Sequence, residues 1–149
     1  MSDEKRILIA DKEDMTGELI ERALSRMDDF KTYTFYHVKD GTKALKFITN
    51  YSGGRIEFLL TGLDMHPYNE NKNGGIILLE KLETWKGIRP TYIGVLSSQL
   101  NDLEDHNLVK GKHYDFTIEK GPTSFIQTLT DTLQKYIDQT KVLKQKCVD

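Results

Sequence analysis

The chain has 149 residues, with 21 Lys or Arg against 23 Asp or Glu and 38% hydrophobic residues. This length suits a single domain with its own core, and the composition excludes a fully disordered chain. A formal net charge of −2 excludes a general affinity for nucleic acid or anionic membranes. The single cysteine excludes an intramolecular disulfide, and no apolar run approaches the ~18 residues of a membrane span. No targeting segment is evident, so we expect a cytoplasmic protein.

The first elements predicted are a buried strand and an amphipathic helix. Residues 6–10 form an apolar run that is typical of a strand buried on both faces. Residues 14–27 follow with apolar side chains at every fourth position, which predicts a helix. We expect its inner face to carry Met15, Leu19, Ala23 and Met27, with Ile20 and Leu24 beside them.

The same order of strand and helix then repeats. Residues 33–38 are aromatic and β-branched and predict a second strand. A helix from Gly41 through Ile48 follows, because Asp-Gly ends the strand and can cap a helix. A Ser-Gly-Gly turn at 52–54 precedes a third strand at 56–61.

A polar stretch at 65–75 separates the third strand from a third helix, whose apolar residues are Ile76, Leu79 and Leu82. Pro90 stops further helix, and residues 92–96 predict a fourth strand.

The last part of the chain predicts a short helix, a strand and a long helix. The short helix covers 101–109 and the fifth strand 114–118. The last helix begins at Pro122 or Thr123 and has an apolar stripe formed by Phe125, Ile126, Leu129, Leu133, Tyr136 and Ile137. We therefore expect a domain over 1–140 and a polar tail over 141–149 that extends the helix or frays.

Five strand–helix repeats predict a three-layer α/β fold with a doubly wound, five-stranded parallel sheet. In such sheets the functional site lies at the carboxyl ends of the strands. The residues at those ends are Asp11, Lys12, Glu13, Gly62, Asp64, Ser97, Ser98 and Lys120.

An acidic cluster after the first strand, a hydroxyl after the fourth and a lysine after the fifth resemble the receiver domain of bacterial response regulators. The resemblance covers residues 5–137 and rests on the stretches 7–13, 40–45, 57–65 and 75–79 together with Lys120. It implies a flavodoxin-like, CheY-like sheet with the strand order 2-1-3-4-5.

In that family, two acidic residues after the first strand help to hold a magnesium ion, and an aspartate ending the third strand accepts a phosphoryl group. A hydroxyl and a lysine contact the phosphate. The chemistry needs all of these groups, because the charges of the attacking carboxylate and the phosphate must be offset by a hard cation and an ammonium.

The resemblance implies that this chain departs from the family at two positions. Asp11 matches the first acidic position, but the second falls on Lys12, and the acceptor position falls on Gly62, which has no side chain. Ser97 and Lys120 match the hydroxyl and the lysine. We therefore expect a pseudo-receiver with no catalytic residue.

Other residues of the cluster leave alternatives open. Lys12 can pair with Asp11, Glu13 or Asp64 and replace magnesium with a built-in cation. Asp11 is at most half of a metal site, or only a carboxylate favoured by a helix dipole. A shift of the third strand by two residues would make Asp64 the acceptor. The family's aromatic switch position falls on Thr117.

Three functions follow as hypotheses. The first is a stand-alone pseudo-receiver that has no cofactor, is not an enzyme and binds a histidine kinase, an effector or a second copy of itself through 101–112 and 125–137. The second is a divergent response regulator that is phosphorylated on Asp64 with Mg²⁺. The third is a small-molecule binder that uses the space above Gly62.

Overall fold

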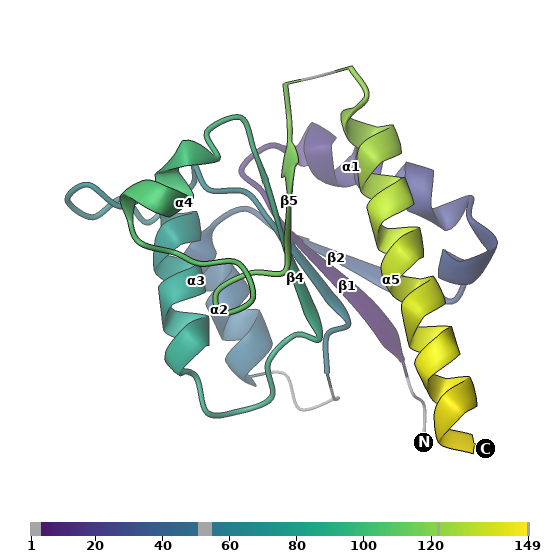
Figure 1. Cartoon of the computed structure of the whole chain (residues 1–149). Coiled ribbons are helices and arrows are strands. Elements are labelled where there is room, and N and C mark those ends of the chain that lie inside the picture. Colours follow the sequence, from purple (N-terminus) through teal and green to yellow (C-terminus); the bar gives the residue numbers. More distant parts are fainter. Residues whose placement is uncertain (1–3, 51–54, 122, 149) are drawn as a thin grey trace.

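The computed structural model describes residues 4–50, 55–121 and 123–148. Its centre is a parallel sheet of five strands in the order β2-β1-β3-β4-β5 (Figure 1). The strands are Lys5–Ala10 (β1), Tyr33–Val38 (β2), Phe58–Thr61 (β3), Tyr92–Ser97 (β4) and Phe116–Glu119 (β5). The predicted fold class and strand order are confirmed.

Helices cover both faces of the sheet. They are Asp14–Ser25 (α1), Gly41–Asn50 (α2), Gly74–Thr84 (α3), Asn101–Asp105 (α4) and Phe125–Val148 (α5), with a 3-10 helix at Asp28–Phe30 (η1). In Figure 1, α1 and α5 lie on one side of the sheet and α2, α3 and α4 on the other. The molecule therefore has three layers.

Two apolar cores fill the space between the layers, and β1 contributes to both. Leu8 and Ala10 belong to the core under α2 and α3, while Ile7 and Ile9 belong to the core under α1 and α5. All four residues are at most 1% exposed. The prediction of a central strand buried on both faces is confirmed, because alternate side chains of one strand point into different layers.

The predicted inner face of α1 is confirmed at Ile20 and Leu24 and wrong at Met15 and Leu19. Met15 and Leu19 are 68% and 41% exposed, and the buried residues are Thr16, Gly17, Ile20 and Leu24. Gly17 sets this face, because a Cβ there would lie 2.7 Å from Nδ1 of His37 on β2. The helix packs its glycine against this imidazole and leaves the methionine outside. It also ends at Ser25, before η1, and not at residue 27.

The region between β4 and β5 also differs from the prediction. Helix α4 ends at Asp105 and not at residue 109, because Asn107 adopts a left-handed φ of 62° that cannot continue a helix. Strand β5 begins at Phe116, since Tyr114 instead forms an isolated bridge with Lys110.

Other boundaries move by one to three residues. Strand β3 begins at Phe58 and β4 ends at Ser97, two residues and one residue later than expected. Helix α5 begins at Phe125, and its stripe packs as predicted, with Leu129, Leu133 and Ile137 buried. Pro122 and the turn predicted at 52–54 lie outside the described residues. The backbone of α5 passes position 140 without a break. In the parts of the chain that the structure describes, no helix is both long and apolar enough to span a membrane.

Candidate functional site at the carboxyl ends of the strands

A cavity of about 450 Å³ opens where the strands end. The parallel register brings the ends of β1, β3, β4 and β5 to one edge of the sheet. Every residue that we expected at the site lines this cavity: Asp11, Lys12, Glu13, Gly62, Asp64, Ser97, Ser98 and Lys120. The space required by the small-molecule hypothesis is therefore present.

Asp11 and Lys120 form an ion pair in which the carboxylate is buried and the lysine is half-buried. Lys120 Nζ lies 2.6 Å from Asp11 Oδ2, and the Asp11 side chain is only 2% exposed. The backbone N–H of Glu13 donates to Oδ1 of the same carboxylate over 2.8 Å. Both oxygens of Asp11 are thus held, and its charge is offset by the lysine that follows β5.

Gly62 occupies the place beside this pair. Thr61 is the register partner of Ala10, and Gly62 N–H donates to the carbonyl of Ala10 over 2.8 Å. A Cβ on Gly62 would lie 3.2 Å from Asp11 Oδ2, so the carboxylate of Asp11 rests against the glycine. The strand position next to Asp11 therefore has no nucleophilic side chain.

Lys12 and Asp64 form a second ion pair at the mouth of the cavity. Lys12 Nζ lies 2.6 Å from Asp64 Oδ2, with both side chains 49% exposed. Tyr68 donates its hydroxyl to Asp64 Oδ1 over 2.7 Å. The hydrogen bonds from Lys12 and Tyr68 hold the pKa of Asp64 below its usual range. The hydrogen bond to Asp64 raises the pKa of Lys12 in turn.

The register of β3 places Asp64 outside the sheet. The strand ends at Thr61, paired with Ala10 on one side and Val95 on the other, so Gly62 and not Asp64 is the residue that follows the strand. Asp64 instead lies in the loop that leads to α3.

Ser97 is the hydroxyl that the receiver resemblance singles out, and Thr117 stands where that resemblance expects an aromatic ring. Ser97 is 6% exposed, and its Oγ accepts the N–H of Gln99 over 2.9 Å. Thr117 is exposed and Phe116 is buried in the core. An aromatic ring at the family's switch position is therefore missing.

Tyr68 is the site residue that sequence reasoning missed. Its loop is closed at the base, because the N–H groups of Gly74 and Gly75 donate to the carbonyls of Met65 and Leu63. The closed loop holds Tyr68 near Asp64, where the tyrosine hydroxyl donates to the carboxylate. A tyrosine four residues after an aspartate in a polar loop carries no signal for such a contact.

Solved structures with the same fold are receiver domains. The phosphorylated cyanobacterial phytochrome response regulator RcpA matches with a TM-score of 0.74 at 17% identity, over 91% of this chain and 96% of its own. The chain has the receiver fold. The receiver domain of an HD domain-containing protein from Pseudomonas fluorescens matches with a TM-score of 0.67 at 14% identity, over 97% and 95% of the two chains. The chemotaxis response regulator CheY4 of Vibrio cholerae gives 0.63 at 17% identity, over 89% and 98%.

No protein-family model and no curated protein matches this sequence. At identities of 14 to 17%, the likeness establishes the fold and leaves the chemistry to be argued from the residues.

Receiver chemistry requires magnesium, and the donor set at these strand ends does not fit the ion. Mg²⁺ prefers carboxylate oxygens and water, but both oxygens of Asp11 are engaged and the next residue is a lysine. Within residues 4–50, 55–121 and 123–148, no group of three or more His, Cys, Asp or Glu side chains is placed to hold a metal.

Proposed function

We propose that this protein is a pseudo-receiver of a two-component signalling system, which acts by binding another protein and not by accepting a phosphoryl group on aspartate. The glycine at the strand end beside Asp11 carries the proposal. Gly62 offers no atom that can attack phosphorus, and the carboxylate nearest to it is already bound to Lys120.

The charges around Gly62 support the same proposal. An incoming phosphoryl group needs uncommitted positive charge, but Lys120 and Lys12 each contact a carboxylate at 2.6 Å. The two ion pairs balance the charges of both lysines without a metal, and the carboxylate of Glu13 also lines the cavity. This arrangement favours one permanent state of the site over a switch between two states.

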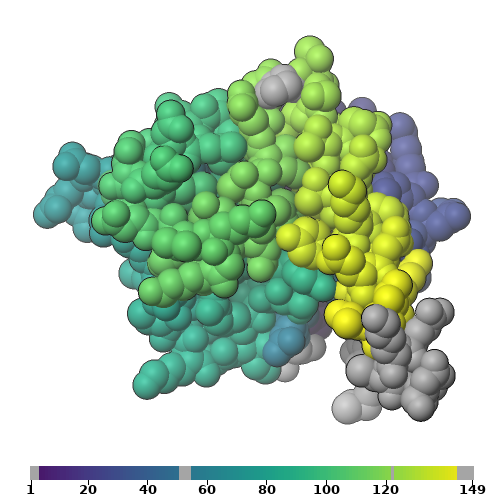
Figure 2. Space-filling model, in the orientation of Figure 1, coloured from purple at the N-terminus to yellow at the C-terminus, as the bar shows by residue number. Residues whose placement is uncertain are grey.

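The partner surface that we propose lies where residues 101–121 and α5 are side by side on one face of the molecule (Figure 2). Val109 is 55% exposed there, and α4 is only five residues long. The partner is a signalling protein such as a histidine kinase or an effector, or a second copy of the chain. This surface includes the predicted segments 101–112 and 125–137.

Phosphorylation by a small donor tests the proposal. The wild-type protein and the variant Lys12→Asp/Gly62→Asp are incubated with acetyl phosphate and Mg²⁺, and their intact masses are measured. The double variant restores both carboxylates that the family pattern requires and is the positive control. We expect the mass of one phosphoryl group on the double variant and no change in the wild type.

The alternative function, phosphorylation of Asp64, predicts a different result. It requires a phosphoryl group on the wild type that is lost in Asp64→Asn, and that result would contradict the pseudo-receiver. Circular dichroism spectra of all three proteins establish that each is folded.

A further inference from the structure

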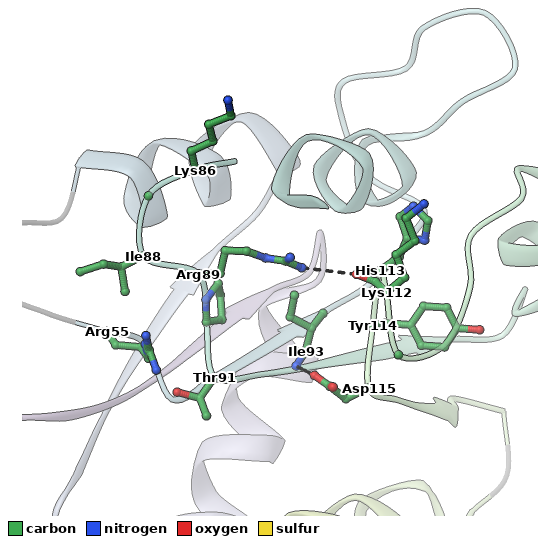
Figure 3. Close-up of a pocket in the computed structure, with 13 residues that line it drawn as sticks. Arg55, Lys86, Ile88, Arg89, Thr91, Ile93, Lys112, His113, Tyr114 and Asp115 are labelled. Atoms are coloured by element: carbon green, nitrogen blue, oxygen red, sulfur yellow. Dashed lines mark hydrogen bonds between the residues drawn. The ribbon is translucent and has the colours of Figure 1, made fainter. Parts of the chain in front are cut away.

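A second and larger cavity lies at the opposite edge of the sheet. It has a volume of about 600 Å³ and opens at the amino ends of β3, β4 and β5, since Arg55, Arg89 and Asp115 all precede those strands. Its other charged or titratable lining residues are Lys86, Lys112, His113 and Tyr114. In Figure 3, Arg89 lies between Arg55 and Lys86 on one side and Lys112 and His113 on the other. Nothing in the receiver resemblance involves this edge.

The cavity carries an excess of positive charge. Four cationic side chains line it against one carboxylate, that of Asp115. This carboxylate is itself engaged, because Asp115 Oδ2 accepts the N–H of Ile93 over 2.7 Å. Lys112 has a distant partner in Glu83 at 3.9 Å. Across the described ranges of the chain, no ion pair neutralises Arg55, Lys86 or Arg89.

Two of the lining side chains are positioned by contacts with the backbone. The Arg89 guanidinium donates to the carbonyl of Lys112 over 3.4 Å, which extends it across the cavity (Figure 3). His113 Nδ1 accepts the N–H of Val109 over 3.0 Å. A neutral His113 ring therefore carries its hydrogen on Nε2, where it adds a donor to the site.

From this geometry we propose that the cavity at the amino ends of the strands binds a small anion with two or more phosphate groups. The cations come from three separate segments, at Arg55, at Lys86 and Arg89, and at Lys112, and the cavity of about 600 Å³ has room for more than one phosphate group. Guanidinium groups match phosphate oxygens in bidentate geometry. The site is concave, and the whole chain has a net charge of −2, which favours a small ligand that fits the cavity over a long polyanion that also meets the acidic surface.

Trp85, the only tryptophan of the chain, provides the readout. Its indole packs over Gly87, and both Lys86 and Gly87 line the cavity. Trp85 fluorescence and isothermal calorimetry are recorded while inorganic tripolyphosphate, pyrophosphate and orthophosphate are added at low ionic strength. We expect saturable binding of one tripolyphosphate, weaker binding of pyrophosphate and the weakest binding of orthophosphate.

Variants locate the binding. Lys86→Gln removes one cation near a phosphate, and we expect it to weaken tripolyphosphate binding about fivefold. We expect Arg89→Gln to weaken the binding at least as much. Arg22→Gln, which removes an exposed charge on α1 on the other side of the sheet, is the matched control and is expected to bind like the wild type. Thermal unfolding of each variant checks that it is folded.

The results that overturn the proposal are equally specific. They are an absence of saturable binding to tripolyphosphate, or equal weakening in Arg22→Gln and Arg89→Gln, which would indicate diffuse attraction. Binding of a single-stranded oligonucleotide without binding of tripolyphosphate would also overturn it and favour a nucleic-acid surface.

Binding of ATP is measured in a further titration. Affinity equal to that of tripolyphosphate supports a site for phosphates alone, and tighter binding supports a site for a nucleotide.

Discussion

At the carboxyl ends of the strands, Lys12 and Lys120 each contact a carboxylate at 2.6 Å. At the amino ends, Arg55, Lys86 and Arg89 surround a cavity with no such contact among the described residues. The two cavities belong to one sheet and differ in how their charges are balanced. Both lysines of the first site are paired with carboxylates of the protein, whereas three cations of the second site have no such pairing among the described residues. The carboxyl-end edge, where receivers carry their chemistry, is thus the edge whose lysines are already paired with carboxylates.

The largest expected effect is the loss of the cation that pairs with the buried carboxylate of Asp11. In Lys120→Ala the carboxylate of Asp11, 2% exposed, keeps its charge without its partner, and we expect the free energy of unfolding to fall by about 2 kcal/mol. Urea denaturation measures this change. Lys86→Ala, which removes an exposed cation at the other cavity, is expected to cause no measurable loss.

A second substitution that removes the negative charge of Asp11 distinguishes the effect of an unpaired carboxylate from the effect of lost packing around Lys120. If the uncompensated carboxylate is responsible, Lys120→Ala/Asp11→Asn regains stability relative to Lys120→Ala. A double variant that is less stable than Lys120→Ala would show that the ion pair does not matter in this way.

A methyl group on Gly62 gives the next largest effect. In Gly62→Ala the new Cβ meets Asp11 Oδ2 at 3.2 Å, so the carboxylate must move relative to Lys120. We expect a loss of about 1 kcal/mol in urea denaturation. Gly121→Ala is the control in the same cavity, because its Cβ has an ordinary contact of 3.8 Å with Glu119. Equal losses in the two variants would contradict close packing at Gly62.

At the amino-end cavity, removing the carboxylate is expected to increase anion binding. Asp115→Asn keeps an oxygen that can accept the N–H of Ile93 and removes one negative charge from the lining. Tripolyphosphate affinity should rise about fivefold, measured by calorimetry. Asp131→Asn, an exposed carboxylate on α5, is expected to leave the affinity unchanged. A fall in affinity for Asp115→Asn would contradict the electrostatic account.

The smallest effect is a titration shift at the exposed pair. The pKa of Asp64 lies below its ordinary value of 3.8, chiefly because Lys12 donates to it. A carboxyl with a lowered pKa stabilises the folded state above its unfolded pKa, and this stability is lost as the pH falls through the folded value. In Lys12→Ala, NMR titration should show the pKa of Asp64 rising. The pKa of Asp29, which Lys141 lowers, should not move.

Much of the fold could be predicted because its signals are local. The apolar run at residues 6–10 and the stripe of α5 follow directly from how side chains alternate in a strand and recur in a helix. The exposure of Met15 and Leu19 on α1 could not be predicted in this way, because the helix places Gly17 against the ring of His37, twenty positions later in the chain. Residues 106–109 were expected to be helical, and the left-handed backbone of Asn107 prevents this.

The sequence by itself determined which residues gather at the carboxyl ends, since parallel strands must end at a common edge. It also determined that Gly62 can supply no nucleophile. Only the tertiary structure decided which lysine neutralises which carboxylate, because each pair joins segments that are distant in the chain: Lys120 with Asp11, and Lys12 with Asp64. The cationic cavity at the opposite edge was likewise decided by tertiary structure, since its residues come from the separate segments before β3, β4 and β5 and show no pattern in sequence. Charge balance at a site depends on distances in space, and composition reports only the total.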